Sequence, residues 1–224
     1  GDLQRLLGIE VQRALDAPVL SLFAVQSHDD LRALLAGASH TPTASATLTP
    51  ARGAHSRLSA TVHTIDGLLL LEMEPGDPVS TLDTSALLLQ CSEMQEKLYR
   101  SQTIEELWQH MIEYVRRLTG FERVMLYKFH PDYSGEVVAE TLAPRLTPFL
   151  GHHYPATDIP EPARKLYAKN WLRTIPDVQD EQLPLVPQQR ADSDTPLNLT
   201  HARLRGVSPV HIQYLQNMGV QASL

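Results

Sequence analysis

The side chains best placed to do chemistry are a histidine, an aspartate and two arginines in the second half of the chain. His211 would share one helix face with three other residues, Tyr214, Leu215 and Met218. A histidine in such an apolar stripe is more often a core residue than a functional one. Asp158 has an equally plain structural role as a helix N-cap, because Pro160 follows it. Arg173 and Arg205 would ordinarily be surface cations, so residue type alone leaves the function open.

Enzymatic chemistry is disfavoured because its usual patterns are missing. The sequence contains no G-x-S-x-G, no P-loop and no G-x-G-x-x-G. Its one cysteine, Cys91, falls on a helical stripe far from His211 in sequence, which favours a buried, inert thiol over a reactive one. The ten histidines include no H-x-H or H-E-x-x-H pattern, and only His152 and His153 are adjacent. The sequence therefore predicts no catalytic residues and no metal site.

Two strands and two short helices would position these side chains. Residues 123–129 alternate as a strand, and residues 136–142 follow a turn as its partner. One helix should run from about 158 to 170, and another from Ser208 to before Gly219.

Proline is concentrated in this part of the chain. Ten of the sixteen prolines lie between Pro144 and Pro209, which predicts a fixed, irregular backbone wrapped around something. Within it, residues 178–206 show no convincing period and indicate a long ordered insertion or a loop.

The first half predicts a separate α+β unit followed by long helices. Its opening residues have helical spacing, and residues 58–73 alternate as a hairpin around a type I′ turn at Asp66-Gly67. Pro75–Pro78 marks the end of this unit. Residues 84–119 then predict two helices, the second of which begins with a capping box at Thr103 and Glu106.

The composition is that of a globular protein with 224 residues and a net charge of −7. No cluster of Lys or Arg suggests a nucleic-acid partner. The longest apolar runs, such as Leu68–Leu71, are too short to cross a membrane. The chain opens without a secretory signal and has a single cysteine, which together predict a cytoplasmic location.

Three motifs resemble those of phytochromes. Residues 149–160, which read F-L-G-H-H-Y-P-A-T-D-I-P, are similar to the first signature of that family, and residues 205–220 to its second. Residues 120–129 with 135–137 match the opening strands of its GAF domain. The hairpin that ends at residue 75 resembles the close of its PAS domain.

The resemblance implies an α+β fold with antiparallel sheets flanked by helices. It places a partial PAS domain at residues 1–78, connecting and dimer helices with the first GAF helix at 79–119, and a GAF domain at 120–224. The insertion 178–206 resembles the lasso of the family's figure-of-eight knot. The resemblance also leads us to expect that the N-terminal part of the PAS domain and the C-terminal part of the GAF domain lie outside this chain.

The resemblance is to bacteriophytochromes in particular. Plant and many cyanobacterial phytochromes attach their bilin to a cysteine just before the histidine of the second signature, where this chain has Val210. Bacteriophytochromes tether biliverdin IXα, a linear tetrapyrrole, to a cysteine ahead of the PAS domain. That covalent cysteine is absent from this chain, so we expect non-covalent binding to the chain as written.

The family's residue roles carry over to matching positions. The backbone carbonyl of Asp158 and the ring of His211 would surround a water beneath the protonated pyrrole nitrogens. Propionate binding would fall to Arg173, Arg205, Ser208, Tyr167 and Ser223. The D ring would be walled by aromatic and apolar side chains, namely Tyr127, Tyr154, Tyr214, Met125 and Ile159.

The resemblance implies a red/far-red light receptor that signals by isomerisation of the bilin. Its expected partners are a second copy, bound through helices 84–119, and a PHY domain with a histidine kinase output. Whether the apolar stripe of these helices faces a partner or only the GAF core stays open here. The alternative function is a PAS–GAF regulatory module without light sensing, which binds a cyclic nucleotide or another small molecule or only dimerises. An enzyme ranks last, since this chain offers no catalytic site.

Overall fold

The chain forms two compact units. The computed structural model describes residues 2–15, 17–39, 44–76, 84–180, 183–187 and 195–224. One unit combines residues 1–80 with 166–224, and the other comprises residues 81–165. The first unit therefore joins two stretches that are far apart in the sequence.

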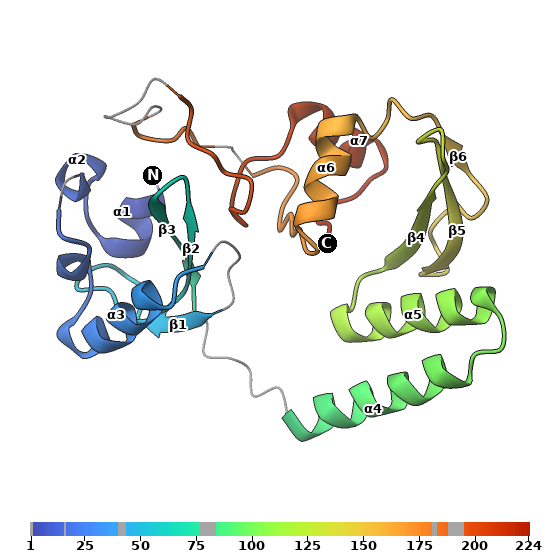
Figure 1. Ribbon diagram of the computed structural model, residues 1–224, viewed down its shortest axis with the longest axis horizontal. Coiled ribbons are helices and arrows are strands. Elements are labelled where there is room, and N and C mark those ends of the chain that lie inside the picture. The colour runs from blue at the N-terminus through green and yellow to red at the C-terminus, as the bar shows by residue number, and fades with distance from the viewer. Residues whose placement is uncertain (1, 16, 40–43, 77–83, 181–182, 188–194) are drawn as a thin grey trace. The chain divides into compact units, whose positions relative to one another are not determined.

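The N-terminal part of the first unit is a three-stranded sheet with helices on one face (Figure 1). The helices are α1 (Asp2–Leu7), α2 (Val11–Ala14) and α3 (His28–Ala36), with two 3-10 turns, Val19–Leu22 and Val25–Ser27, before α3. The strands are β1 (Ser45–Leu48), β2 (Leu58–Ile65) and β3 (Leu68–Pro75), antiparallel in the order β1-β2-β3.

The predicted hairpin of this sheet is confirmed. Ile65 pairs with Leu68, and the two residues between them, Asp66 and Gly67, have φ values of 50° and 77°. Positive φ at both positions is what a type I′ turn requires. Glycine pays no steric penalty there, and aspartate is among the few residues that tolerate it.

The core of this part lies between the sheet and the helices. Alternate residues of β2, namely Leu58, Ala60 and Val62, are buried on one face. They pack with apolar side chains from α1, α3 and β1, including Leu7, Leu31, Leu34 and Leu48. The alternating apolar residues of β2 and the helically spaced leucines of α3 thus pack into one core.

The C-terminal part of the first unit contains α7 (Pro209–Asn217), which has Ser208 at its N-cap and Pro209 in its first turn, as predicted. Leu215 of α7 packs with Ile175 and Val178 in a second small core. Ile175 and Ser223 exchange two backbone hydrogen bonds, of 2.7 and 2.9 Å. The described residues between 178 and 206 contain no helix and no strand beyond one isolated bridge residue, Pro196, as expected for either a long ordered insertion or a loop.

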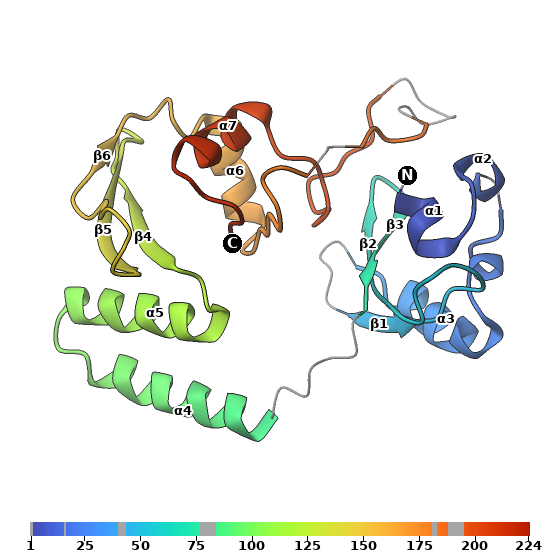
Figure 2. The ribbon, with the colours of Figure 1, turned by 180° about the vertical axis from the view of Figure 1, so that it is seen from behind.

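The second unit places a helix hairpin beside a second antiparallel sheet. Helices α4 (Thr84–Arg100) and α5 (Ile104–Thr119) lie side by side (Figure 2), and α5 packs on the sheet. The strands are β4 (Arg123–Phe129), β5 (Gly135–Leu142) and β6 (His153–Tyr154), in the order β4-β5-β6.

The break between α4 and α5 has the predicted capping chemistry. The Thr103 hydroxyl accepts the Glu106 N–H at 3.2 Å, and the Glu106 carboxylate accepts the N–H of Gln102 at 2.8 Å. At the other end of α5, Gly120 takes the left-handed conformation and donates to Arg116.

Two local predictions need correction. Helix α6 (Glu161–Lys169) begins after Pro160 rather than near Asp158, because residues 155–158 form a turn in which the Asp158 N–H donates to the Pro155 carbonyl. Cys91 is half-buried rather than buried, and its sulfur lies 3.3 Å from the Tyr114 hydroxyl.

None of the helices in the described part of the chain has the length and apolar character needed to cross a bilayer.

Candidate functional site

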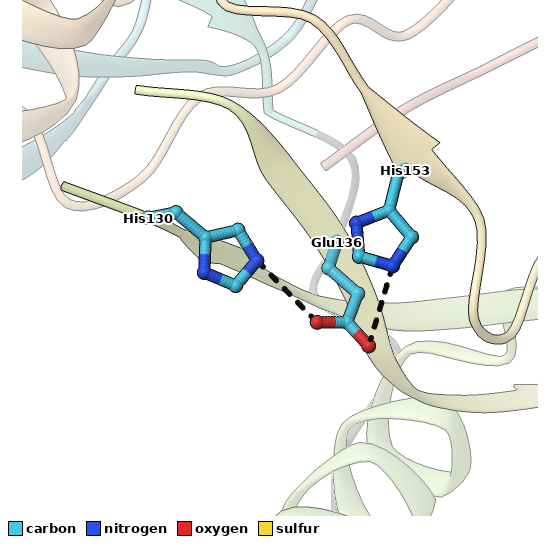
Figure 3. A group of neighbouring side chains, drawn as sticks. All are labelled: His130, Glu136 and His153. Atoms are coloured by element: carbon cyan, nitrogen blue, oxygen red, sulfur yellow. Dashed lines mark ion pairs between the residues drawn. The ribbon is translucent and has the colours of Figure 1, made fainter. Parts of the chain in front are cut away.

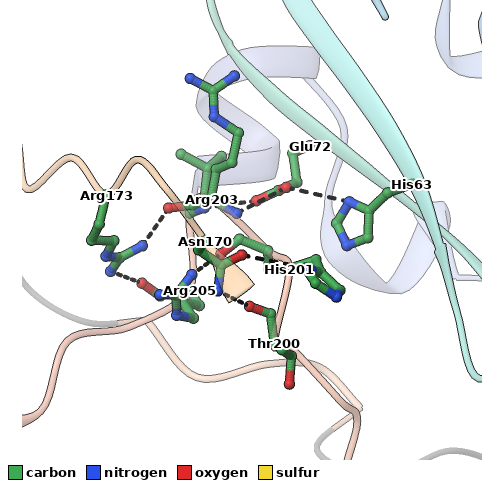
Figure 4. Close-up of polar contacts among 10 residues, drawn as sticks. His63, Glu72, Asn170, Arg173, Thr200, His201, Arg203 and Arg205 are labelled. Atoms are coloured by element: carbon green, nitrogen blue, oxygen red, sulfur yellow. Dashed lines mark hydrogen bonds and ion pairs between the residues drawn. The ribbon is translucent and has the colours of Figure 1, made fainter. Parts of the chain in front are cut away.

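Arg173 and Arg205 lie next to each other in the first unit, as the predicted propionate clamp requires. The Arg173 guanidinium donates to the backbone carbonyls of Arg203 and Arg205, and the Arg205 guanidinium donates to the Ala202 carbonyl at 2.7 Å (Figure 4). These bonds hold both side chains but leave each guanidinium with further N–H donors. Two cations are thus fixed side by side.

The electrostatics of this pair favour an anion. Burial lowers the pKa of Arg173, and the positive charge of Arg205 lowers it further. Burial also lowers the pKa of Arg205. Among the described residues neither arginine forms an ion pair, although the more distant charge of Glu72 partly offsets the burial. A carboxylate bound between them would relieve both the repulsion and the loss of solvation.

Glu72 of β3 anchors the segment that carries Arg205. Its two carboxylate oxygens accept the backbone N–H groups of Arg203, at 3.0 Å, and Leu204, at 2.7 Å (Figure 4). Beside it, fully buried His63 of β2 has Nδ1 3.8 Å from the carboxylate. The face of the first sheet that points away from its helices is therefore covered by residues 201–204.

A polar contact fixes the same segment from the other side. The Asn170 side chain donates to the Thr200 carbonyl at 2.9 Å, and its oxygen lies 3.3 Å from Nδ1 of His201. His201 also meets His63 edge to face, with ring centroids 6.4 Å apart. Asn170, which follows α6, and His63 of β2 thus both contact the segment that leads to Arg205, and they help to fix the position of its side chain.

His211 is near this arginine pair. It is half-buried on α7, and its pKa is lowered by burial and then by the charge of Arg173. The imidazole is therefore neutral near pH 7. Ser208 makes no capping bond with its side chain, and Ser223 pairs with the strand-like segment two residues beyond Arg173. Tyr167, on the part of α6 in this unit, is exposed by nearly half, and desolvation raises its pKa. Tyr214 is also partly exposed.

The second unit brings together two of the three tyrosines of the predicted aromatic wall. The rings of Tyr127 on β4 and Tyr154 on β6 have centroids 5.9 Å apart, and both strands flank β5. Tyr127 crosses β5 at Gly135, where a Cβ atom would overlap its ring. Glycine at this position is thus what allows the two tyrosines to meet. Met125 lies two residues earlier on β4 and is half-buried.

Two arginine contacts hold the segments around Tyr154 and Asp158. Arg123 pairs with the buried Glu140 carboxylate and lies 4.1 Å over the Phe149 ring, while Glu140 accepts the N–H groups of Phe149 and Leu150. Arg164 donates to the carbonyls of Ala156 and Ile159 and lies 4.3 Å over the Tyr133 ring. Asp158 itself is exposed, and Ile159 is half-buried.

The predicted site residues thus form two groups. The first unit contains the residues predicted to bind the propionate, together with His211 and Tyr214, and the second contains Tyr127, Tyr154, Met125, Asp158 and Ile159. Sequence reasoning did not single out Glu72, Glu140 or Arg164, which position these groups. The sequence showed only that Glu72 and Glu140 are charged residues within predicted strands. Nothing in it indicated which backbone groups they would bind.

Comparison with known proteins identifies two domain families in the chain. The family model of the GAF domain matches residues 103–224, which is just over half of the chain, and that of the PAS fold matches residues 2–76. Cyanobacterial phytochrome B of Nostoc sp. is 43% identical over 162 residues, 72% of this chain and 22% of its own length. A bacteriophytochrome of Xanthomonas campestris is 41% identical over 155 residues, 69% of this chain and 24% of its own length. The chain thus spans less than a quarter of these curated relatives.

Solved structures extend the match to nearly the whole chain. The chromophore-binding domain of Stigmatella aurantiaca phytochrome P1 superposes with a TM-score of 0.84 at 32% identity, covering 99% of this chain and 73% of that one. The chromophore-binding domain of a bacteriophytochrome from R. palustris gives 0.86 at 29% identity, covering 99% and 71%. The chain therefore belongs to the phytochrome family, as the PAS–GAF region of a bacteriophytochrome.

Proposed function

We propose that this chain binds a bilin, biliverdin IXα, and serves as the sensory part of a red/far-red light receptor. The observation that carries this proposal is the pair Arg173 and Arg205, two neighbouring guanidinium groups with no ion pair among the described residues and with His211 close by. Such a pair fits a ligand with carboxylate tails. Solved relatives that superpose on 99% of the chain are chromophore-binding domains.

Each group of residues has a distinct task in this proposal. The two arginines, with Ser208, Tyr167 and Ser223, bind a propionate. His211 is neutral because of burial and the charge of Arg173, and its ring, with the Asp158 carbonyl as an acceptor, surrounds a water beneath the pyrrole nitrogens. Tyr127, Tyr154, Tyr214, Met125 and Ile159 line the D ring. The bound bilin supplies light absorption and isomerisation of the bond between its C and D rings.

The way the site is held suggests how it would signal. Residues 201–205 are anchored on the first sheet through Glu72, and residues 156–159 are held by Arg164. A change in the hydrogen bonds of the D ring would shift the balance between two arrangements of these anchored segments, which a PHY domain and a kinase in the whole protein would read. Val210, rather than a cysteine, precedes His211, so this signature would not supply a covalent link.

We also propose the domain limits 1–78, 79–119 and 120–224, and a homodimer formed through residues 84–119. The support for the dimer is exposed apolar surface: Leu88 and Leu89 of α4 are 63% and 62% exposed. In the full-length protein, Leu88→Glu should shift the mass measured by sedimentation toward the monomer. The control Lys97→Gln, which changes the net charge equally but lies half a turn around the same helix, should not. A dimer that is equally stable in both variants would refute this interface.

Reconstitution tests the proposed function. The full-length protein is mixed with biliverdin, and absorption spectra are recorded before and after red illumination. We expect a red-shifted band and a light-induced difference spectrum that far-red light reverses. The double variant Arg173→Met/Arg205→Met should bind biliverdin more weakly, and Arg57→Met, a substitution outside the arginine pair, should not. Absence of any shifted band, together with heat released on adding a cyclic nucleotide, would favour the alternative small-molecule module.

A further inference from the structure

We propose a binding site for a divalent transition-metal ion, of the Zn²⁺ class, formed by His130, Glu136 and His153. Nitrogen atoms of the two imidazoles and an oxygen of the carboxylate all lie within 4.8 Å of one another (Figure 3). Imidazole and carboxylate are ligands that suit Zn²⁺ and its neighbours in the first transition row. All three residues belong to the second unit and lie outside the proposed bilin set.

The three residues converge because of the strand order. His130 follows the end of β4, Glu136 is the second residue of β5, and His153 begins β6. Glu136 and His153 are paired neighbours across β5 and β6. The turn after β4 brings His130 to the other side of the same carboxylate, so the two rings face each other nearly parallel, with centroids 6.1 Å apart.

The distances suit shared coordination better than direct hydrogen bonding. Nε2 of His130 lies 3.4 Å from one carboxylate oxygen, and Nε2 of His153 lies 3.9 Å from the other. Both separations exceed the usual N–H···O length of about 2.7–3.2 Å. Tetrahedral ligands about 2.0–2.1 Å from a zinc ion stand about 3.4 Å apart. The group is therefore close to coordination geometry without making the bonds that would otherwise hold it together.

A buried nitrogen supports the same conclusion. Nε2 of His130 is shielded from solvent and has no hydrogen-bond partner among the residues that the structure describes. Leaving such an atom unsatisfied is costly, and nearly all buried polar atoms find a partner. A metal ion between His130 and Glu136 would satisfy it. Three protein ligands would leave one tetrahedral position for water.

The position of the site indicates what binding would do. The ion would join the β4–β5 turn to β6, and β6 contains Tyr154, which contacts Tyr127. Metal would therefore stiffen the strand that presents the aromatic wall. Motif reasoning missed this site because its residues lie in the turn after β4 and on two different strands rather than in one local pattern.

The test uses the full-length protein made without a bilin, because pyrrole nitrogens would themselves bind metal. After removal of any histidine tag and treatment with a chelator, Zn²⁺ is titrated by calorimetry. We expect the double variant His130→Ala/His153→Ala to bind one ion fewer per chain than the native protein. The control His152→Ala, an exposed residue beside the site, should keep the native stoichiometry. Glu136→Gln should weaken binding at least about 10-fold.

Cobalt provides a second measurement that reports geometry. Co²⁺ bound by these three ligands should give a visible ligand-field band in the native protein and in His152→Ala, but not in His153→Ala. His153 is 66% exposed in its side chain, so this single substitution should leave the fold intact, as circular dichroism will verify. Equal Zn²⁺ stoichiometry in the native protein and the double variant, or a cobalt band that persists in His153→Ala, would overturn the proposal. Neither outcome depends on whether the protein binds a bilin.

Discussion

At the scale of single residues, the chain depends on a few positions where one side chain decides a local arrangement. Gly135 leaves room for the Tyr127 ring, and His63 occupies a fully buried place on β2 where no hydrogen bond within the described residues satisfies its ring nitrogens. A substitution at Gly135 would add atoms to a space that is already filled, and a substitution at His63 would remove a buried titratable group. Each leads to a prediction.

The first prediction concerns Gly135. Gly135→Ala should destabilise the protein by about 1–3 kcal/mol, because the added methyl group overlaps the Tyr127 ring. Chemical denaturation will measure this. Adding Tyr127→Ala to the same protein should remove most of the penalty of the alanine at 135. Gly37→Ala is the matched control, since a Cβ there meets only ordinary contacts, and a loss as large as that of Gly135→Ala would contradict the steric explanation.

The second prediction concerns pH and His63. Burial lowers the pKa of His63 below its ordinary value of 6.5, more than the nearby Glu72 charge raises it. The unfolded chain therefore binds this proton more readily, so the stabilising contribution is complete above pH 6.5 and is lost as the pH falls through the lowered pKa. His63→Leu should remove this part of the acid sensitivity, from about pH 6.5 down to about pH 5.

Thermal unfolding across that range is the measurement for His63. The difference in stability between the native protein and His63→Leu should shift in favour of the variant as the solution becomes more acidic. His152→Leu, at an exposed position, serves as the control and should follow the native curve. Parallel curves for native protein and His63→Leu would show that His63 does not titrate against folding.

At the scale of elements, buried carboxylates connect strands to segments without regular structure. Glu72 on β3 and Glu140 on β5 each accept two backbone N–H groups from a segment that leads to site residues. Because these segments are not paired in a β-sheet, the carboxylates accept the backbone N–H groups that a neighbouring strand would otherwise bind. The site geometry therefore depends on strands that contribute no ligand contact themselves.

The third prediction tests this role at Glu72. Glu72→Gln keeps one acceptor oxygen but replaces the other with an amide that cannot accept, leaving the Arg203 or Leu204 N–H unsatisfied. The expected cost is about 1–3 kcal/mol. Hydrogen exchange at residues 203 and 204 should accelerate in Glu72→Gln and stay unchanged in Glu74→Gln, an exposed neighbour on the same strand. Unchanged exchange in both variants would show that Glu72 is not the anchor.

The sequence predicted most elements because each has a local cause. The Asp66-Gly67 turn, the Thr103 cap and the Gly120 helix end follow from residues a few positions apart, and the structure confirms them. The contacts of Glu72 could not be foreseen, since Arg203 lies far along the chain in a loop without period. The arginine pair was expected only from the family's motifs. The predicted start of α6 was wrong by a few residues, because Asp158 closes a turn with Pro155 instead of beginning the helix.

At the scale of the whole molecule, two compact units each contain part of the predicted site. The unit with the arginines combines the first sheet with residues 166–224, so the PAS sheet itself supports the segment that holds the residues proposed to bind a propionate. The proposed function rests on that arrangement. The whole protein must therefore be examined with its pigment to test the proposal.

The most direct measurement compares biliverdin with its dimethyl ester, in which both propionates are neutral. Binding of each to the full-length protein is measured by fluorescence quenching, for the native protein and for Arg173→Met/Arg205→Met. We predict that the native protein binds the free acid at least about 10-fold more tightly than the ester, a difference of about 1.4 kcal/mol, and that the double variant loses this preference. Equal affinity of the native protein for acid and ester, or an undiminished preference in the variant, would contradict the claim that these two arginines bind a propionate.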